Sequence, residues 1–344
     1  MTRKLNLGIV GAGGAVGKEL LRLMAEESFP VDALKLFGAG DSAGDVHTYE
    51  GGHHVIRPFV NPDLRDLDVV VVATPPDQAH DVLRHIASQG VLSIDTSSAS
   101  RLLPDVPLAA PAVDRRALAD HTGAIATPNG LVPPLALVLT RLGELAEIRT
   151  VESTALLSAA ARGRSGITAL SQQVVAVLNQ QPLRPDIFSR PIAFNLVPGW
   201  DSQASCDSTR PNISPDGPTL SEELVLRELS RVLPGLPAEV GLTLAFAPVF
   251  CGTVLFTAVR LERRVSLEAL RRIFSTTPGM VMWEGEEFDT LPGSIDAIEQ
   301  SDILLSRLRV GGDTVRLCLT FDNLRLAARN LILTLEALRD DELV

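Results

Sequence analysis

The sequence predicts an α/β protein with a doubly wound parallel sheet, followed by a second domain of α+β type. Over the first third of the chain, short apolar runs alternate with helical stretches, and a glycine-rich turn joins the first run to the first helix. The length of 344 residues suits two domains. With 45% hydrophobic and 21% charged residues, the composition is that of a folded globular protein.

The first domain is expected to alternate strands with helices. Strands are expected over 5–10, 33–37, 68–73, 91–95 and 123–126, with helices over 16–25 and 77–89. The run Val69–Ala73 is apolar at every position, which is typical of a strand covered by helices on both faces. The polar stretch that carries His47, His53 and His54 is interpreted as a loop. These spacings favour a parallel sheet.

The pattern changes near residue 133, where the second domain is expected to begin. Helices are expected over 135–146, 167–178 and 220–233, the last capped by Thr219 or Ser221. Residues 181–218 are rich in Pro, Ser, Asp and Asn and are interpreted as a long excursion or a partner-facing arm. A final amphipathic helix over 322–338 is expected to return to the first domain. The predicted domains are therefore 1–132 with about 322–344, and 133–321.

Charge and composition exclude several classes of partner. The net charge of −11 and the aromatic content of 4% argue against nucleic acid. The uncharged stretch Val240–Val259 is rich in β-branched residues and contains Pro248, so one or two buried strands are favoured over a membrane helix. Cys206, Cys251 and Cys318 form no metal-binding pattern, so neither a metal site nor a disulfide is expected. The N-terminus reads as a first strand, which predicts a cytoplasmic protein.

The glycine-rich turn is the strongest local signal for a ligand. Gly11 permits a tight turn, Gly13 or Gly14 lets a pyrophosphate approach the backbone, and Gly17 lets the helix pack on the strand. The first helical N–H groups, those of Ala15, Val16 and Gly17, would face the phosphates. These residues are predicted to bind a dinucleotide; the alternative is a turn kept for packing alone.

The loop after the second strand carries the residues that would choose the cofactor. Asp41 lies where an acidic side chain accepts hydrogen bonds from a ribose 2′-OH, and Ser42 follows it. Because this carboxylate would repel a 2′-phosphate, NAD is favoured over NADP. A solvated Asp41 that contacts no ligand is the alternative.

Motifs along almost the whole chain resemble those of the aspartate-semialdehyde dehydrogenase family. They are GAGGAVG at 11–17, SAG at 42–44, IDTSSASR at 94–101, DVPL at 105–108, TPN at 127–129, IAFN at 192–195 and DNLR at 322–325. The resemblance implies a Rossmann-type cofactor domain, a substrate and dimerisation domain, and a homodimer. The family reaction is the phosphorylating oxidation of aspartate semialdehyde to aspartyl phosphate with NADP.

The same resemblance implies that the catalytic groups are missing. The family's nucleophilic cysteine falls at Gly130 and its general base at Thr253, and neither residue can supply that chemistry near neutral pH. The orienting Gln, the Lys and the substrate-binding Arg of the family fall at Leu157, Val225 and Phe246. Since these replacements are apolar, they also disfavour a small dianionic substrate.

Other family positions are retained. Arg101 corresponds to the phosphate-binding Arg of the family, and it either binds an anion or caps the loop beneath the sheet. Glu222 keeps an acid of the family's E-E-x-K pattern, and Asn323 of the DNLR motif joins the cofactor-binding residues.

The sequence therefore favours a non-catalytic member of the family, similar to its Usg-type subgroup, that keeps a dinucleotide-binding fold and dimerises. The retained glycine turn with Asp41 leaves open an active NAD(P)-dependent oxidoreductase of altered substrate and mechanism. A scaffold that requires no cofactor and keeps the glycine turn for packing alone is the third interpretation. The functions open to the non-catalytic member are dimerisation, binding of an unidentified protein partner, or sensing of a nucleotide.

Overall fold

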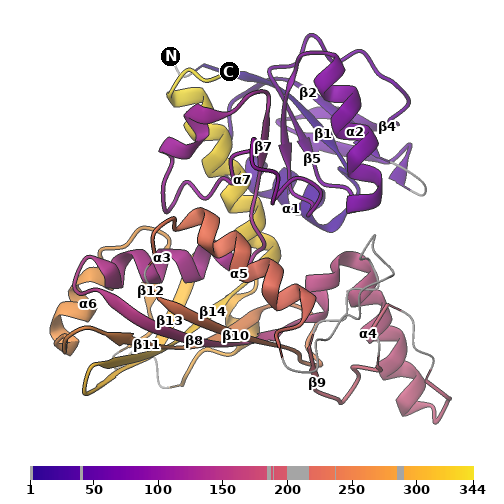
Figure 1. Ribbon diagram of the computed structural model, residues 1–344. Coiled ribbons are helices and arrows are strands. Elements are labelled where there is room, and N and C mark those ends of the chain that lie inside the picture. Colours follow the sequence, from indigo (N-terminus) through magenta and orange to yellow (C-terminus); the bar gives the residue numbers. More distant parts are fainter. Residues whose placement is uncertain are drawn as a thin grey trace. The chain divides into compact units, whose positions relative to one another are not determined.

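A computed structural model describes residues 3–38, 42–183, 187–188, 190–199, 217–236, 238–284 and 290–344. The chain divides into two compact units, shown in Figure 1. Unit 1 comprises Met1–Pro133 with Ala327–Val344, and unit 2 comprises Pro134–Leu326. Asp41, Cys206 and most of the predicted 181–218 excursion lie outside the described residues.

Unit 1 is built on a sheet that is parallel apart from one edge hairpin. The strand order is β3 (Val46–Tyr49), β4 (Gly52–Pro58), β2 (Val31–Gly38), β1 (Leu5–Val10), β5 (Val69–Val72), β6 (Leu92–Asp95) and β7 (Ala124–Ala126). The strand order changes direction at β1, which places a topological switch point at the carboxyl ends of β1 and β5. The doubly wound parallel sheet predicted from the sequence is thus confirmed.

Helices cover both faces of this sheet. Leu7, Ile9 and Val71 pack with helices α1 (Ala15–Glu26) and α7 (Asn323–Asp340) on one face. On the other face, Val70 and Val72 pack with helix α2 (Pro76–Ser88). Because both faces are covered, all four residues of β5 are buried, as expected from the unbroken apolar run.

The prediction that His47, His53 and His54 lie in a loop is wrong. They belong to the antiparallel hairpin β3–β4, in which His47 is opposite His54. Its two turn residues, Glu50 and Gly51, have φ values of 47° and 80°. Positive φ at both central residues is the signature of the tight turn that suits a twisted hairpin. Strand pairing therefore outweighs the polar composition of this segment.

Tyr49 at the end of β3 provides a test of this hairpin, because it is the protein's one tyrosine. Its hydroxyl donates to the carbonyl of Phe29, and burial, with a smaller contribution from Glu50, raises its pKa to about 12. The stabilisation from neutral Tyr49 should be complete below the unfolded pKa of about 10 and be lost as the pH rises through the folded pKa. Native tyrosinate absorbance should therefore appear at higher pH than in denaturant, whereas coincident titrations would contradict this burial.

Unit 2 carries a mixed sheet. Its strands run in the order β12 (Met280–Met282), β13 (Ile303–Gly311), β14 (Thr314–Phe321), β11 (Thr253–Leu261), β8 (Ile148–Leu157), β10 (Glu239–Phe246) and β9 (Val197–Pro198). Helices α3 (Val132–Gly143), α5 (Leu220–Val232) and α6 (Leu267–Ser275) lie along one face in Figure 1, and α4 (Gly163–Leu178) lies to the side. Val151, Ser153 and Ala155 of β8 are buried, whereas Glu152 and Thr154 between them are exposed. The opposite face is thus only partly covered within unit 2.

The uncharged stretch Val240–Val259 forms β10 and β11 joined by a turn, as the sequence predicts. None of the helices in the described part of the chain is long and apolar enough to cross a membrane. The predicted cap of α5 is also present, since the Thr219 hydroxyl accepts from the N–H of Glu222. Helix α7 begins in unit 2, and its residues from Ala327 onward belong to unit 1.

Candidate functional site

The glycine turn lies at the switch point of unit 1, and its backbone leaves no room for side chains. Gly11 has a φ of +90°, and a Cβ there would lie 2.4 Å from the carbonyl oxygen of Ala73. A Cβ on Gly17 would lie 2.3 Å from the carbonyl oxygen of Gly11. Both obstacles are backbone atoms, so only glycine fits at these positions. This close approach brings the first turn of α1 against the carboxyl end of β1.

The N-terminus of α1 has the features of an anion site. Its N-cap, Gly14, is extended and supplies no side-chain cap, and the first turn contains no acidic residue. The helix begins at Ala15, so the N–H groups of Ala15, Val16 and Gly17 are the first of the helix. These groups and the positive end of the helix dipole favour a bound phosphate.

Ser42 packs directly on the glycine turn. A Cβ on Gly13 would lie 2.3 Å from the Cβ of Ser42, and a Cβ on Gly38 would lie 2.6 Å from its Oγ. Glycine at both positions therefore allows the loop after β2 to close over the turn. Since the neighbouring Asp41 lies outside the described residues, the preference for NAD stays a prediction.

Asp95 organises the loop that follows β6. Its buried carboxylate accepts from the N–H of Ser97 at 2.8 Å, and from both the N–H and the hydroxyl of Ser100. Arg101, half-buried, donates from Nη2 to the carbonyl oxygen of Thr96 at 2.6 Å. The Arg101 guanidinium thus donates to the backbone of its own loop, which is the contact expected if Arg101 caps this loop.

Gly130 lies in a turn directly before α3. The side chain of Asn129 accepts from the N–H of Leu131 at 3.0 Å, and its carbonyl accepts from Val132 at 2.8 Å. These bonds form the turn from which the helix begins at Val132, two residues beyond Gly130. Glycine offers no side-chain nucleophile at this helix start.

The other four positions where the family resemblance places site residues lie in unit 2 and are buried. Leu157, Val225 and Phe246 are each 2% exposed, and Leu157 is paired with Phe246 across β8 and β10. Thr253, 1% exposed, begins β11, and its hydroxyl has no hydrogen-bond partner among the described residues. This part of unit 2 is therefore largely apolar.

Sequence reasoning missed one cation beside these residues. The guanidinium carbon of Arg162, at the start of α4, lies 5.9 Å from the centre of the Phe246 ring. Phe188 contacts the same ring edge-on, with the ring centres 5.1 Å apart. A positive charge is thus present next to the position where the family resemblance places its substrate-binding Arg. No local pattern around Arg162 could have revealed this, because the contact joins different elements.

Glu222 contacts backbone rather than an open site. Its Oε2 accepts from the N–H of Thr219 at 2.7 Å, and its Oε1 accepts from the N–H of Leu244 at 2.8 Å. The residue is 7% exposed. One carboxylate oxygen therefore caps α5, and the other joins this helix to β10. Asn323, the first residue of α7, accepts from the hydroxyl of Ser158 at 3.3 Å.

Neither cysteine that the structure describes lies at residue 130, where the family resemblance places the nucleophile. Cys318 is buried in β14, and burial raises the pKa of its thiol. Cys251 is partly exposed in the turn between β10 and β11. Among the residues that the structure describes, no group of His, Cys, Asp or Glu could hold a metal ion.

Known protein families match both units. Residues 6–121 match the NAD-binding domain of semialdehyde dehydrogenase, and residues 139–326 match the dimerisation domain of semialdehyde dehydrogenase. An aspartate-semialdehyde dehydrogenase of Prochlorococcus marinus is 28% identical over 89% of this chain and 87% of its own. A USG-1 protein homolog of Azotobacter vinelandii is 30% identical over 94% of each chain. Among solved structures, aspartate semialdehyde dehydrogenase II of Vibrio cholerae, complexed with ASA, has a TM-score of 0.90, 25% identity and 99% coverage of both chains.

Fold and matches together define a protein with a Rossmann-like NAD-binding domain followed by a dimerisation domain. The chain belongs to the aspartate-semialdehyde dehydrogenase family, as its motifs predict.

Proposed function

We propose that this protein is a dinucleotide-binding member of the family that does not carry out the phosphorylating oxidation of aspartate semialdehyde. The main observation behind this proposal is the glycine at position 130. The family resemblance places the nucleophile there, and a glycine cannot form the thioester that phosphate must attack. The buried Thr253 at the base position and the apolar Leu157, Val225 and Phe246 support the same conclusion.

Retention of the nucleotide is supported by the N-terminus of α1. A turn kept for packing needs glycine at Gly11 and Gly17, but it does not need an uncapped helix start without an acidic first turn. NAD is the proposed cofactor, on the ground that Asp41 would repel the 2′-phosphate of NADP. We place the protein in the cytoplasm.

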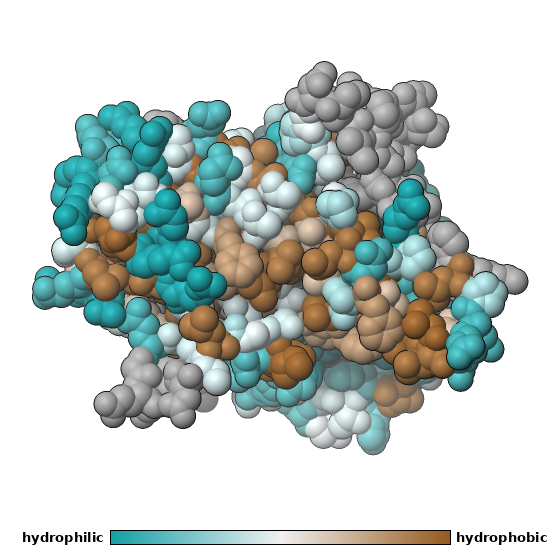
Figure 2. Space-filling view, turned by 90° about the horizontal axis from the view of Figure 1, so that it is seen from below, coloured by the Kyte–Doolittle hydropathy of each residue, from teal (hydrophilic) through white to brown (hydrophobic). Residues whose placement is uncertain are grey.

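We also propose a homodimer built on unit 2, whose residues match a dimerisation domain. The face of its sheet that the helices leave open carries apolar side chains. Phe256 on β11 is 39% exposed, and Val254 is paired with the partly exposed Leu156 on β8. Figure 2 shows apolar residues gathered across the middle of the molecule seen from below. Such a face suits burial against a second copy.

One experiment tests both parts of the proposed function. NAD and NADP are titrated by calorimetry into the wild-type protein, and NAD(P)H is then followed after adding aspartate semialdehyde and phosphate. We expect NAD to bind more tightly than NADP and no reduced cofactor to form. In Ala15→Asp, a carboxylate in the first turn suits the helix dipole but repels pyrophosphate, so binding should weaken at least about tenfold.

Ala15→Asn is the matched control, because it has the same shape without the charge and should bind within a few-fold of the wild type. If neither nucleotide binds, the glycine turn serves packing only and the scaffold interpretation holds. Phosphate-dependent cofactor reduction would refute the inactive assignment. Reduction that does not require phosphate would support the oxidoreductase of altered mechanism.

A further inference from the structure

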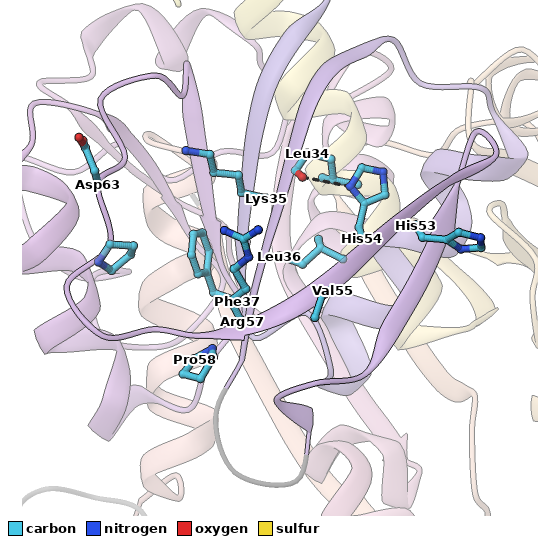
Figure 3. Close-up of a pocket in the computed structure, with 11 residues that line it drawn as sticks. Leu34, Lys35, Leu36, Phe37, His53, His54, Val55, Arg57, Pro58 and Asp63 are labelled. Atoms are coloured by element: carbon cyan, nitrogen blue, oxygen red, sulfur yellow. Dashed lines mark hydrogen bonds between the residues drawn. The ribbon is translucent and has the colours of Figure 1, made fainter.

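A pocket of about 410 Å³ opens between β2 and β4 of unit 1 (Figure 3), within the size range of small-molecule sites. It arises because β4 changes partner along its length. Its residues Gly52–Val55 pair with β3, whereas pairing with β2 begins only where Ile56 meets Leu36. The strands therefore diverge before that point. The pocket, hereafter the β2–β4 pocket, is lined by residues on both sides of it, from Leu34 and His54 to Phe37 and Arg57.

The walls of the β2–β4 pocket are held by hydrogen bonds. Nδ1 of His54 donates to the carbonyl oxygen of Leu34 at 3.1 Å, the contact drawn in Figure 3. On the other side, Nε2 of His85 donates to the carbonyl oxygen of Pro62 at 2.9 Å. The ring of Phe59 packs edge-on against His85, with the ring centres 5.6 Å apart. The pocket is consequently formed before any ligand arrives, which reduces the entropy cost of binding.

Within the described part of the chain, Lys35, Asp63, Arg65 and Asp66 around the β2–β4 pocket form ion pairs, whereas Arg57 does not. Lys35 bonds Asp66 at 2.6 Å, and Arg65 bonds Asp63 at 2.7 Å. The Arg65 side chain holds the pKa of the Asp63 carboxyl well below its usual range. Arg57 makes no hydrogen bond or ion pair with the residues that the structure describes. Among the residues that the structure describes, nothing therefore neutralises the charge of this guanidinium.

Arg57 lies opposite Phe37 in the pairing of β4 with β2, so the cation and an apolar ring line the pocket side by side (Figure 3). Leu34 and Val55 add further apolar surface. We propose that the β2–β4 pocket binds a small organic anion, a carboxylate or a phosphate ester, whose apolar body lies against Phe37. A guanidinium recognises either oxyanion with two parallel hydrogen bonds.

The test uses phenyl phosphate, benzoate and inorganic phosphate as probes, with benzyl alcohol as the neutral probe. Backbone amide shifts are followed over 36–38 and 55–57, and over 13–17 in the glycine turn. We expect saturable shifts in the first two segments with phenyl phosphate or benzoate, and weaker binding of inorganic phosphate. Which of the two aromatic anions binds more tightly identifies the preferred oxyanion.

Arg57→Gln should raise the Kd about tenfold or more, because it removes a charge-assisted hydrogen-bonding group. Arg57→Lys keeps the charge but loses the planar fork, so it should weaken binding less. Arg84→Gln is the matched control, since Arg84 on α2 is exposed and pairs with Asp81 outside the pocket. Circular dichroism of each variant establishes that it is folded.

Several results would overturn the proposal. They are the absence of saturable shifts with either aromatic anion, shifts confined to 13–17, equal binding of benzyl alcohol or inorganic phosphate, and equal weakening by Arg84→Gln. Each would show that Arg57 and the apolar wall do not act together on a ligand.

Discussion

Replacing Glu222 with Ala is expected to destabilise the protein by about 2–6 kcal/mol, because each of two buried N–H groups left without an acceptor costs about 1–3 kcal/mol. Those groups belong to Thr219 and Leu244, which the carboxylate bonds at 2.7 and 2.8 Å. The substitution removes half of the capping box of α5 and its link to β10. Urea unfolding followed by circular dichroism measures the loss.

Glu223→Ala is the matched control one residue further along α5. Glu223 pairs with Arg227 on the surface, so its removal should change the free energy of unfolding by no more than about 0.5 kcal/mol. Similar losses in the two variants would contradict the structural role of Glu222. A large loss in Glu222→Ala alone would mean that the fold is a sufficient reason for Glu222 to be kept, without any role in binding a substrate. This would explain why Glu222 is present although Val225 occupies the position where the family resemblance places a lysine.

Gly17→Ala is expected to cost about 1–3 kcal/mol of stability through overpacking. The added Cβ would lie 2.3 Å from the carbonyl oxygen of Gly11 and 2.8 Å from the Cα of Ala12. Both are backbone atoms, so α1 must move away from β1. Since its N-terminal N–H groups move with it, we expect nucleotide binding to weaken at least about tenfold, measured by calorimetry.

Gly143→Ala provides the control for this change. Gly143 ends α3, and a Cβ there meets nothing within 4 Å. Alanine should therefore be neutral or stabilise by up to about 1 kcal/mol, because it lowers the entropy of the unfolded chain. If Gly17→Ala behaved like Gly143→Ala, the close approach of α1 to β1 would be contradicted.

The sequence predicted unit 1 well because its signals are local. The apolar β5, the helix α2 with Pro76 in its first turn, and the glycine turn are all visible within short windows. The hairpin β3–β4 was missed because its residues are polar. Gly51-Gly52 beside Glu50 offered a turn signal, but strand pairing in the assembled sheet decided the outcome.

Unit 2 was predicted less completely. Strand β8 alternates buried Val151, Ser153 and Ala155 with exposed residues, but its buried serine and exposed Thr154 weaken the contrast between apolar and polar positions. Strands β12, β13 and β14 were also missed. Their stability comes from pairing with each other and with β11, and such nonlocal pairing is weakly encoded in any short window.

By itself, the sequence determined the family, the glycine turn and the absence of a side chain at Gly130, because each is a property of residue identity. The tertiary structure alone decided the partners of individual side chains. It set the Glu222 carboxylate on the backbone of β10, Arg162 over the Phe246 ring, and Arg57 in the β2–β4 pocket. These contacts join residues far apart in the chain, and they exist only once the strands and helices have packed.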